Sequence, residues 1–141
     1  MLSIRHNDEN TLREVLASEG GFAWWYVDLV DEDADGAVLI WFFGLPFLPG
    51  ARSHPPAADR PGINLVTYER GRPSGYVLQQ LSPNDVDWMP GSLRWRFGAS
   101  EIEAEVDETS VALRADLDLE LPAPGGRWRG TLEVDGPRCV F

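Results

Sequence analysis

The sequence of 141 residues contains no lysine, a single cysteine and only two histidines. With Cys139 alone, neither an internal disulfide nor a cysteine-based zinc cluster can form, and we expect this residue to fill a buried position. His6 and His54 have no metal-ligand spacing to a partner, so surface positions are expected for both. No metal site and no cofactor is predicted, because phosphate-binding loops and nucleophile motifs are also missing.

Positive charge is scarce as well. Twelve arginines stand against 23 aspartates and glutamates, which gives a formal net charge of -11 at pH 7. Nucleic-acid binding draws most of its affinity from basic side chains that neutralise phosphates. The composition therefore excludes DNA and RNA as partners.

Long hydrophobic runs are absent. The longest, from Ala37 to Phe43, is far shorter than the roughly 20 residues that span a bilayer. The stretch from Met1 to Glu19 is mixed and polar, so it resembles neither a secretory signal nor a membrane anchor. These features predict a cytoplasmic protein, with membrane contact at most peripheral. The length predicts a single domain over residues 1–141.

Alternation of apolar and polar residues is the dominant pattern. Between Val111 and Leu121 the odd positions are apolar, and most even positions are charged. A period of two, bounded by Gly, Pro, Asp or Asn clusters, predicts strands over residues 23–30, 37–47, 63–69, 75–81, 93–97, 101–107, 111–121 and 128–134. The predicted fold is all-β, an antiparallel sandwich or up-and-down barrel of about eight strands.

Other elements are few. At most one short helix is predicted, over residues 11–18, where the sequence carries a capping box. The proline-rich segment 52–62 is expected to be an irregular loop, which in a barrel could form a lid at the mouth. The acidic segment 31–36 superficially resembles a calcium loop, but it lacks the closing glutamate and lies between two strands, so a hairpin turn is predicted.

Two neighbouring segments are rich in aromatic residues. Residues 20–28 read GGFAWWYVD, and residues 37–47 read AVLIWFFGLPF. Together with INLVTYER at 63–70, they resemble the hydroxyneurosporene synthases, or carotenoid 1,2-hydratases. The resemblance implies a lipocalin-like (calycin-like) barrel or sandwich, and it implies that this chain is the N-terminal lobe of a longer, two-lobe protein.

The resemblance also implies a reaction, the addition of water to a terminal isoprenoid double bond by a cofactor-independent hydro-lyase of carotenoid biosynthesis. Such chemistry needs a proton donor in a dry pocket, where apolar surroundings raise the pKa of a carboxyl group. Asp28 shares a strand face with Trp24 and Tyr26, so Asp28 is the catalytic candidate and Tyr26 a weaker one. The alternatives are that Asp28 only ends the strand and accepts hydrogen bonds, and that Tyr26 only forms a structural hydrogen bond through its hydroxyl.

An interior that holds a ligand is the wider expectation, because six tryptophans are many for this length. The interior would accept an apolar isoprenoid or another hydrophobic small molecule. The candidate lining residues are Trp24, Trp25, Trp41, Phe43, Asn64 and Tyr68. An outward position for Asn64 is equally consistent with the pattern.

Three functions remain open at this stage. The first is the hydratase, and the second is a non-catalytic lipocalin-like module that binds an apolar small molecule. The third is a structural lobe, buried against a missing second lobe or a second copy of the chain, because an exposed apolar patch drives association. The first depends on strand register, since a shift by one residue moves Asp28 to the other face.

Overall fold

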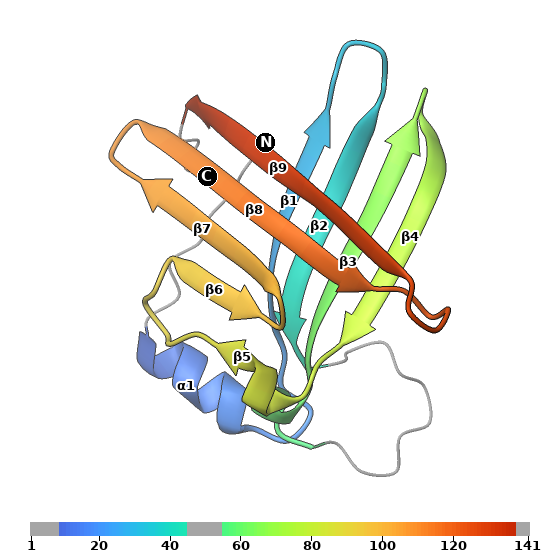
Figure 1. Cartoon of the computed structure of the whole chain (residues 1–141). Coiled ribbons are helices and arrows are strands. Elements are labelled where there is room, and N and C mark those ends of the chain that lie inside the picture. The colour runs from blue at the N-terminus through green and yellow to red at the C-terminus, as the bar shows by residue number, and fades with distance from the viewer. Residues whose placement is uncertain (1–8, 45–54, 138–141) are drawn as a thin grey trace.

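The computed structural model describes residues 9–44 and 55–137, which form two β-sheets and a few helical turns (Figure 1). The helical elements are α1 (Glu9–Ala17), η1 (Ala57–Asp59) and η2 (Pro83–Asp85). The first four strands are β1 (Ala23–Val30), β2 (Gly36–Phe43), β3 (Pro61–Glu69) and β4 (Arg72–Gln80). The other strands are β5 (Val86–Asp87), β6 (Arg94–Phe97), β7 (Ser100–Val106), β8 (Ser110–Glu120) and β9 (Arg127–Pro137).

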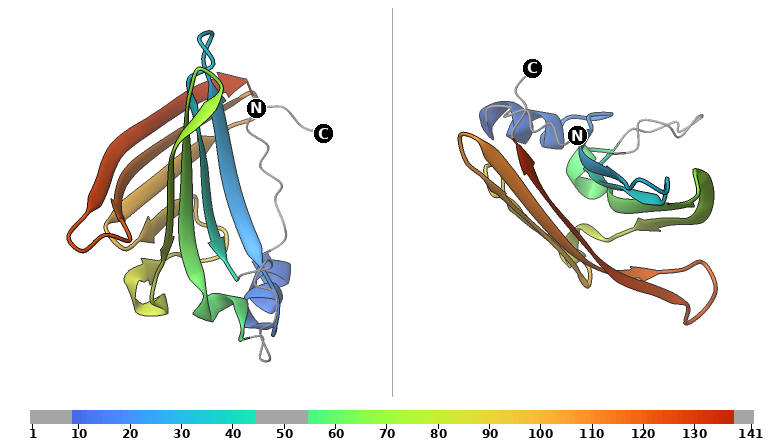
Figure 2. Two further views of the ribbon diagram at one scale, coloured as in Figure 1. Left: turned by 90° about the vertical axis from the view of Figure 1, so that its right-hand side faces the viewer. Right: turned by 90° about the horizontal axis from the view of Figure 1, so that it is seen from above.

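The strands form two antiparallel sheets in simple sequence order. Strands β1 to β4 make the first sheet and strands β5 to β9 the second. Within the described ranges no strand pairing joins the two sheets, so the fold is a two-layer sandwich and not a closed barrel (Figure 2). The strands of the second sheet cross those of the first obliquely (Figure 1). The all-β, antiparallel prediction is confirmed, and the very short β5 is the strand that the sequence pattern missed.

Strand alternation decides which side chains lie between the sheets. In β2, Ala37, Leu39, Trp41 and Phe43 are buried, whereas the residues between them are only partly covered. β1 pairs with β2 along its whole length, with Trp25 opposite Trp41. Because directly opposite residues share a face, this register places the odd-numbered residues of both strands in the core.

The hydrophobic core lies between the two sheets. Its buried strand residues are Val27, Ala37, Leu39, Trp41, Phe43, Ile63, Leu65, Val77, Trp95, Phe97, Ile102, Ala104, Leu113, Ala115, Leu117 and Leu119. Ser100 is the buried polar residue of the described chain, and its Oγ accepts a hydrogen bond from the Asp118 N–H at 2.9 Å. Where the sheets meet, the Glu120 N–H donates to Gln79 Oε1 at 3.0 Å.

The helix α1 lies at one end of the sandwich, where Leu16 packs against the core (Figure 1). The predicted helix over 11–18 is confirmed, with its start two residues earlier, at Glu9. In the part of the chain that the structure describes, no helix combines the length and the apolar character needed to cross a bilayer.

Several predicted boundaries differ from those of the structure. β2 ends at Phe43, because Gly44 adopts a φ of 87° and donates its N–H to the Arg60 carbonyl at 2.9 Å. Residues 45–47 of the predicted strand lie outside the described residues. The segment 52–62 is not irregular throughout, since η1 forms within it and β3 begins at Pro61. The expectations for His6, His54 and Cys139, and for residues 52–54 as part of a lid, lie outside the described residues.

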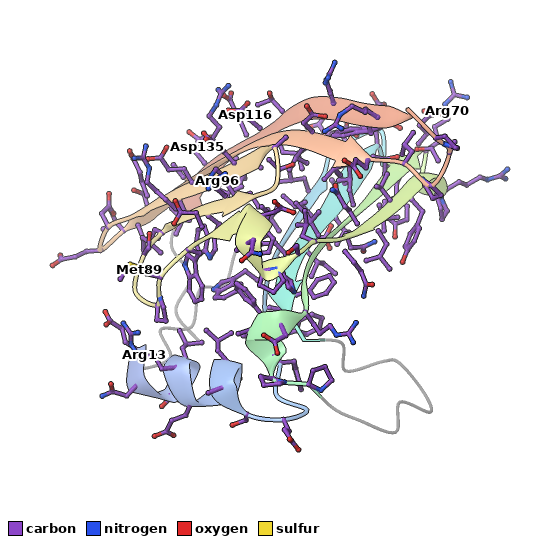
Figure 3. The ribbon with its side chains drawn as sticks, turned by 60° about the horizontal axis from the view of Figure 1, so that its bottom comes forward. Arg13, Arg70, Met89, Arg96, Asp116 and Asp135 are labelled. Carbon is purple, nitrogen blue, oxygen red and sulfur yellow. The ribbon has the colours of Figure 1, made fainter. Side chains whose placement is uncertain are left out.

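The outer face of the second sheet carries ion pairs between neighbouring strands. Arg94 of β6 pairs with Glu103 of β7 at 3.0 Å, because the strand register places these two residues opposite each other. Arg114 of β8 pairs with Asp116 at 2.9 Å and also with Glu133 of β9. In Figure 3, Arg96, Asp116 and Asp135 project from this sheet. The face has the polar character of a sheet surface in contact with water.

Asp118 connects β8 to β9 within this charged face. Its carboxylate accepts hydrogen bonds from Arg127 Nε at 2.6 Å and from Arg129 Nε at 3.2 Å. The Arg127 bond is the main reason that the pKa of Asp118 lies below the ordinary aspartate value of 3.8; partial desolvation opposes it, and Arg129 adds to it.

We expect Asp118→Asn to reduce the acid sensitivity of the fold. Because the folded-state pKa is lowered, the stabilisation from the Asp118 carboxylate is present above about pH 4 and is lost as the pH falls through the folded-state pKa. The variant should have a lower urea midpoint than the wild type at pH 7 and a smaller drop in midpoint on acidification. Glu105→Gln, at an exposed position of the same face, is the matched control. A drop as large as that of the wild type would contradict this account.

Candidate functional site

The structure divides the predicted site residues between the two faces of the first sheet. The inward-facing residues are Trp25, Trp41 and Phe43. The outward-facing residues are Trp24, Tyr26, Asp28, Asn64 and Tyr68. The sequence period of two groups Trp24, Tyr26 and Asp28 correctly, but the face that they occupy is the outer one.

The interior position expected for Trp24, Tyr26 and Asp28 is wrong. Asp28 is exposed, and Tyr26 and Trp24 on the same face are about half exposed. Among the described residues every aspartate and glutamate is exposed except Asp118, which is half-buried in the second sheet. The space between the sheets therefore receives no described carboxyl group, and no dry pocket surrounds Asp28.

The inward tryptophans belong to an aromatic cluster between the sheets. Its members are Trp25, Trp41, Phe43, Trp88, Trp95 and Phe97. The ring centroids of Trp25 and Trp88 lie 4.8 Å apart, and those of Trp41 and Trp95 lie 5.3 Å apart. These rings fill the core by packing against one another, some pairs edge to face, such as Trp25 with Trp88, and others stacked, such as Trp25 with Trp41.

Two polar atoms in this cluster have no acceptor among the described residues. Nε1 of Trp41 and Nε1 of Trp95 are buried without a hydrogen-bond partner in this part of the chain, in residues that are 2% and 4% exposed. Trp88, in contrast, donates its Nε1–H to the Ser92 carbonyl at 3.0 Å. An unpaired buried N–H costs about 1–3 kcal/mol. The steep angle of 70° between the Trp41 and Trp95 rings permits at most a weak contact of one N–H with the other ring.

The outer face of the first sheet is apolar over most of its area. We define the outer apolar face as Trp24, Tyr26 and Val30 of β1, Val38, Ile40 and Phe42 of β2, Val66 and Tyr68 of β3, and Tyr76 and Leu78 of β4. Val30 is 74% exposed, Tyr76 66% and Trp24 50%. The described helices lie at one end of the sandwich and not over this face (Figures 1 and 2).

Register arranges these side chains in rows across the sheet. The rows are Trp24, Phe42, Gly62 and Gln80; Tyr26, Ile40, Asn64 and Leu78; and Asp28, Val38, Val66 and Tyr76. In the first row the Phe42 ring lies over Gly62, where an added Cβ would collide with it. Because Gly62 has no side chain, the Phe42 ring can lie flat across the neighbouring strand and does not protrude from the face.

Few polar groups interrupt these rows. Asn64 Nδ2 donates to the Val77 carbonyl at 2.9 Å, so the Asn64 amide binds the sheet itself. Of the two positions left open for Asn64, the structure has the outward one, and the interior position expected for Tyr68 is wrong. Asp28 is the one charged side chain in the three rows. The face therefore combines a broad apolar surface with a single carboxylate on its edge strand.

The members that sequence reasoning missed lie mostly on β2 and β4. They are Val30, Val38, Ile40, Phe42, Val66, Tyr76 and Leu78. One signal for them is the uninterrupted apolar run from Ala37 to Phe43. A strand with one face in water alternates, whereas a strand that is apolar on both sides is typical of a sheet covered on both faces.

The hairpin ends beside this face are mainly acidic. The exposed charged residues there are Asp31, Glu32, Asp33, Asp35, Glu69, Arg70 and Arg72. Asp31 Oδ1 accepts the N–H groups of Asp33 and Asp35 at 2.9 Å, which confirms the predicted hairpin turn. Asp35 Oδ1 accepts the Arg70 N–H at 2.7 Å and joins this turn to the β3–β4 hairpin, from whose tip Arg70 projects (Figure 3).

The structure defines a two-layer antiparallel sandwich with one charged outer face and one apolar outer face. Comparison with protein-family models, with curated proteins and with solved structures gives no match for this chain. The properties of the apolar face are therefore the main guide to what the protein does.

Proposed function

We propose that this chain is a non-catalytic binding module that docks a partner on its outer apolar face. The observation that carries the proposal is the contrast between the two outer faces of one molecule. The second sheet covers its outer face with ion pairs such as Arg94 with Glu103. The first sheet presents aromatic and aliphatic side chains there instead, with Tyr76 and Val30 mostly exposed. Contiguous apolar surface of this kind marks an interaction site.

The size and shape of the face favour a partner surface over a small molecule. Four strands of about eight residues give a face of about 500 Å², from the usual strand spacing and rise. That is near the upper end of the patches, about 300–600 Å², that monomeric proteins expose. Small-molecule sites are usually concave, and an open sheet face is better matched by another broad surface.

A titration with the neutral apolar dye Nile red tests the proposal. The wild type should enhance the dye emission, and Ile40→Lys should weaken dye binding at least about fivefold, because a buried charge without a partner opposes apolar contact. Ala112→Lys is the matched control: it places the same charge on the other outer face, on strand β8 between Glu105 of β7 and Asp135 of β9. Equal dye binding by the wild type and Ile40→Lys would contradict the proposal.

A second variant keeps the test informative if Ile40→Lys fails to fold. Tyr76 is 66% exposed, so Tyr76→Lys should preserve the folded circular dichroism spectrum. It should still weaken dye binding, because Tyr76 lies in the same row as Val38 and Val66.

Carotenoid 1,2-hydratase activity stays a prediction that rests on sequence resemblance. Its proton donor would have to come from outside the described core, because the inward side chains there include no carboxyl group. The proposed docking role is compatible with a two-lobe protein, since a second lobe is one kind of partner surface.

An apolar small molecule inside the sandwich is the second candidate function. The observation in its favour is the pair of buried indole N–H groups of Trp41 and Trp95, for which residues 9–44 and 55–137 provide no acceptor. A ligand with a carbonyl or hydroxyl oxygen would satisfy them. Such a ligand would have to displace rings that now pack against one another, whereas the outer apolar face is already open.

A further inference from the structure

We infer that the partner of the outer apolar face is a protein surface that is apolar at its centre and basic around it. This inference rests on the proposed docking function and specifies the chemistry of the partner. Three features support it: the charge beside the face, the area of the face, and the position of Asp28.

The charges beside the outer apolar face are predominantly negative. At the hairpin ends five carboxylates, of Asp31, Glu32, Asp33, Asp35 and Glu69, stand against the guanidinium groups of Arg70 and Arg72. The whole chain carries a formal net charge of -11. We call these charged hairpin ends the acidic rim. The acidic rim would attract a basic partner before contact, whereas it would repel an acidic partner or an anionic lipid surface.

The area of the face argues against a second copy of the chain as the occupant. Two copies that met through this face alone would bury about 1,000 Å² in total, against about 1,600 Å² in a standard stable interface. Each copy would also bring its own acidic rim and its charge of -11. A basic partner that reaches beyond the apolar face to the rim gains area and favourable charge pairing together.

Asp28 provides a specific position for a cation within the contact. It lies on β1 on the same face as Tyr26, and Trp24 and Tyr26 form a tilted ring pair with centroids 6.4 Å apart. A lysine or arginine that pairs with Asp28 would lie beside these aromatic side chains. Contact with the partner would exclude water from the Asp28 carboxylate and strengthen the ion pair.

The test uses two helical peptides with the same leucine face, one with lysine and one with glutamate on the polar side. Fluorescence anisotropy of the labelled peptides measures their dissociation constants for the full chain. We expect the lysine peptide to bind at least about tenfold more tightly than its glutamate twin. Asp28→Asn should weaken the lysine peptide about fivefold to tenfold, and Glu101→Gln, which removes one exposed acid from the other outer face, less than about twofold.

The outcomes separate this inference from the proposed function. Equal binding of both peptides, with Nile red binding still lost in Ile40→Lys, would overturn the basic partner and leave the docking face in place. Dye binding unchanged in Ile40→Lys would overturn both. A wild-type dimer in light scattering that Ile40→Lys dissociates would identify a second copy as the occupant. Binding to phosphatidylcholine or phosphatidylglycerol vesicles that the same variant abolishes would identify a lipid surface, and either result would overturn the inference.

Discussion

Trp41→Ala is expected to lower the free energy of unfolding by about 3–5 kcal/mol, as large-to-small substitutions of buried aromatic residues do. Trp41 is 2% exposed, and its ring lies against those of Trp25 and Trp95. The variant loses this packing and leaves a cavity between the sheets. Because it also removes an unpaired indole N–H, the loss should fall toward the lower end of the range. Equilibrium urea unfolding measures it.

Trp24→Ala is the matched control for Trp41→Ala. Trp24 is half exposed on the outer face of β1, so its removal should cost less than about 1 kcal/mol, the value of a surface cross-strand contact. Similar losses for the two variants would contradict the division of the aromatic residues between a core face and a docking face.

Gly44→Ala is expected to cost about 2–3 kcal/mol of unfolding free energy. Gly44 follows the last residue of β2 and has a φ of 87°, a backbone conformation that residues other than glycine rarely adopt. A Cβ at this position would also collide with the Gly21 carbonyl oxygen and approach Phe22. Strain there would shift the end of the strand that supplies the centre of the outer apolar face. Urea unfolding measures this loss as well.

Gly136→Ala is the control for Gly44→Ala, because it measures the effect of replacing a glycine that has neither a positive φ nor close neighbours. No atom lies within 4 Å of an added Cβ at Gly136, which is an ordinary strand residue of β9. Its replacement should change the unfolding free energy by less than about 1 kcal/mol. The change should be stabilising, because alanine fits the extended backbone at this position and reduces the conformational entropy of the unfolded chain. Equal losses at positions 44 and 136 would contradict the structural account of the turn after β2.

Local sequence pattern was sufficient for most strands and turns. Alternation over 101–107 and 111–121 predicted β7 and β8, and the Asp31 turn followed from its acidic, strand-flanked context. These features depend on neighbours along the chain, so they can be read from it. The end of β2 could not, because it depends on a hydrogen bond from Gly44 to Arg60, in a segment that is distant in sequence.

The face on which each aromatic residue lies was the main quantity that the sequence left open. Trp24 and Trp25 are adjacent and chemically alike, yet one is on the outer face and the other in the core. In a strand that is apolar on both sides, alternation does not identify the inward side, because either choice buries hydrophobic residues. Packing against the second sheet decides it, and that decision places Asp28 on the outer face of the sheet.

Methyl NMR during titration with octyl glucoside below its micelle concentration distinguishes binding on the outer apolar face from binding between the sheets. We expect the methyl signals of Val38, Ile40, Val66 and Leu78 to shift, because these side chains form the outer apolar face. The methyl signals of Leu39, Leu65 and Leu113, which are buried between the sheets, should stay in place. Shifts confined to the buried set would contradict the account and would identify the interior of the sandwich as the binding site.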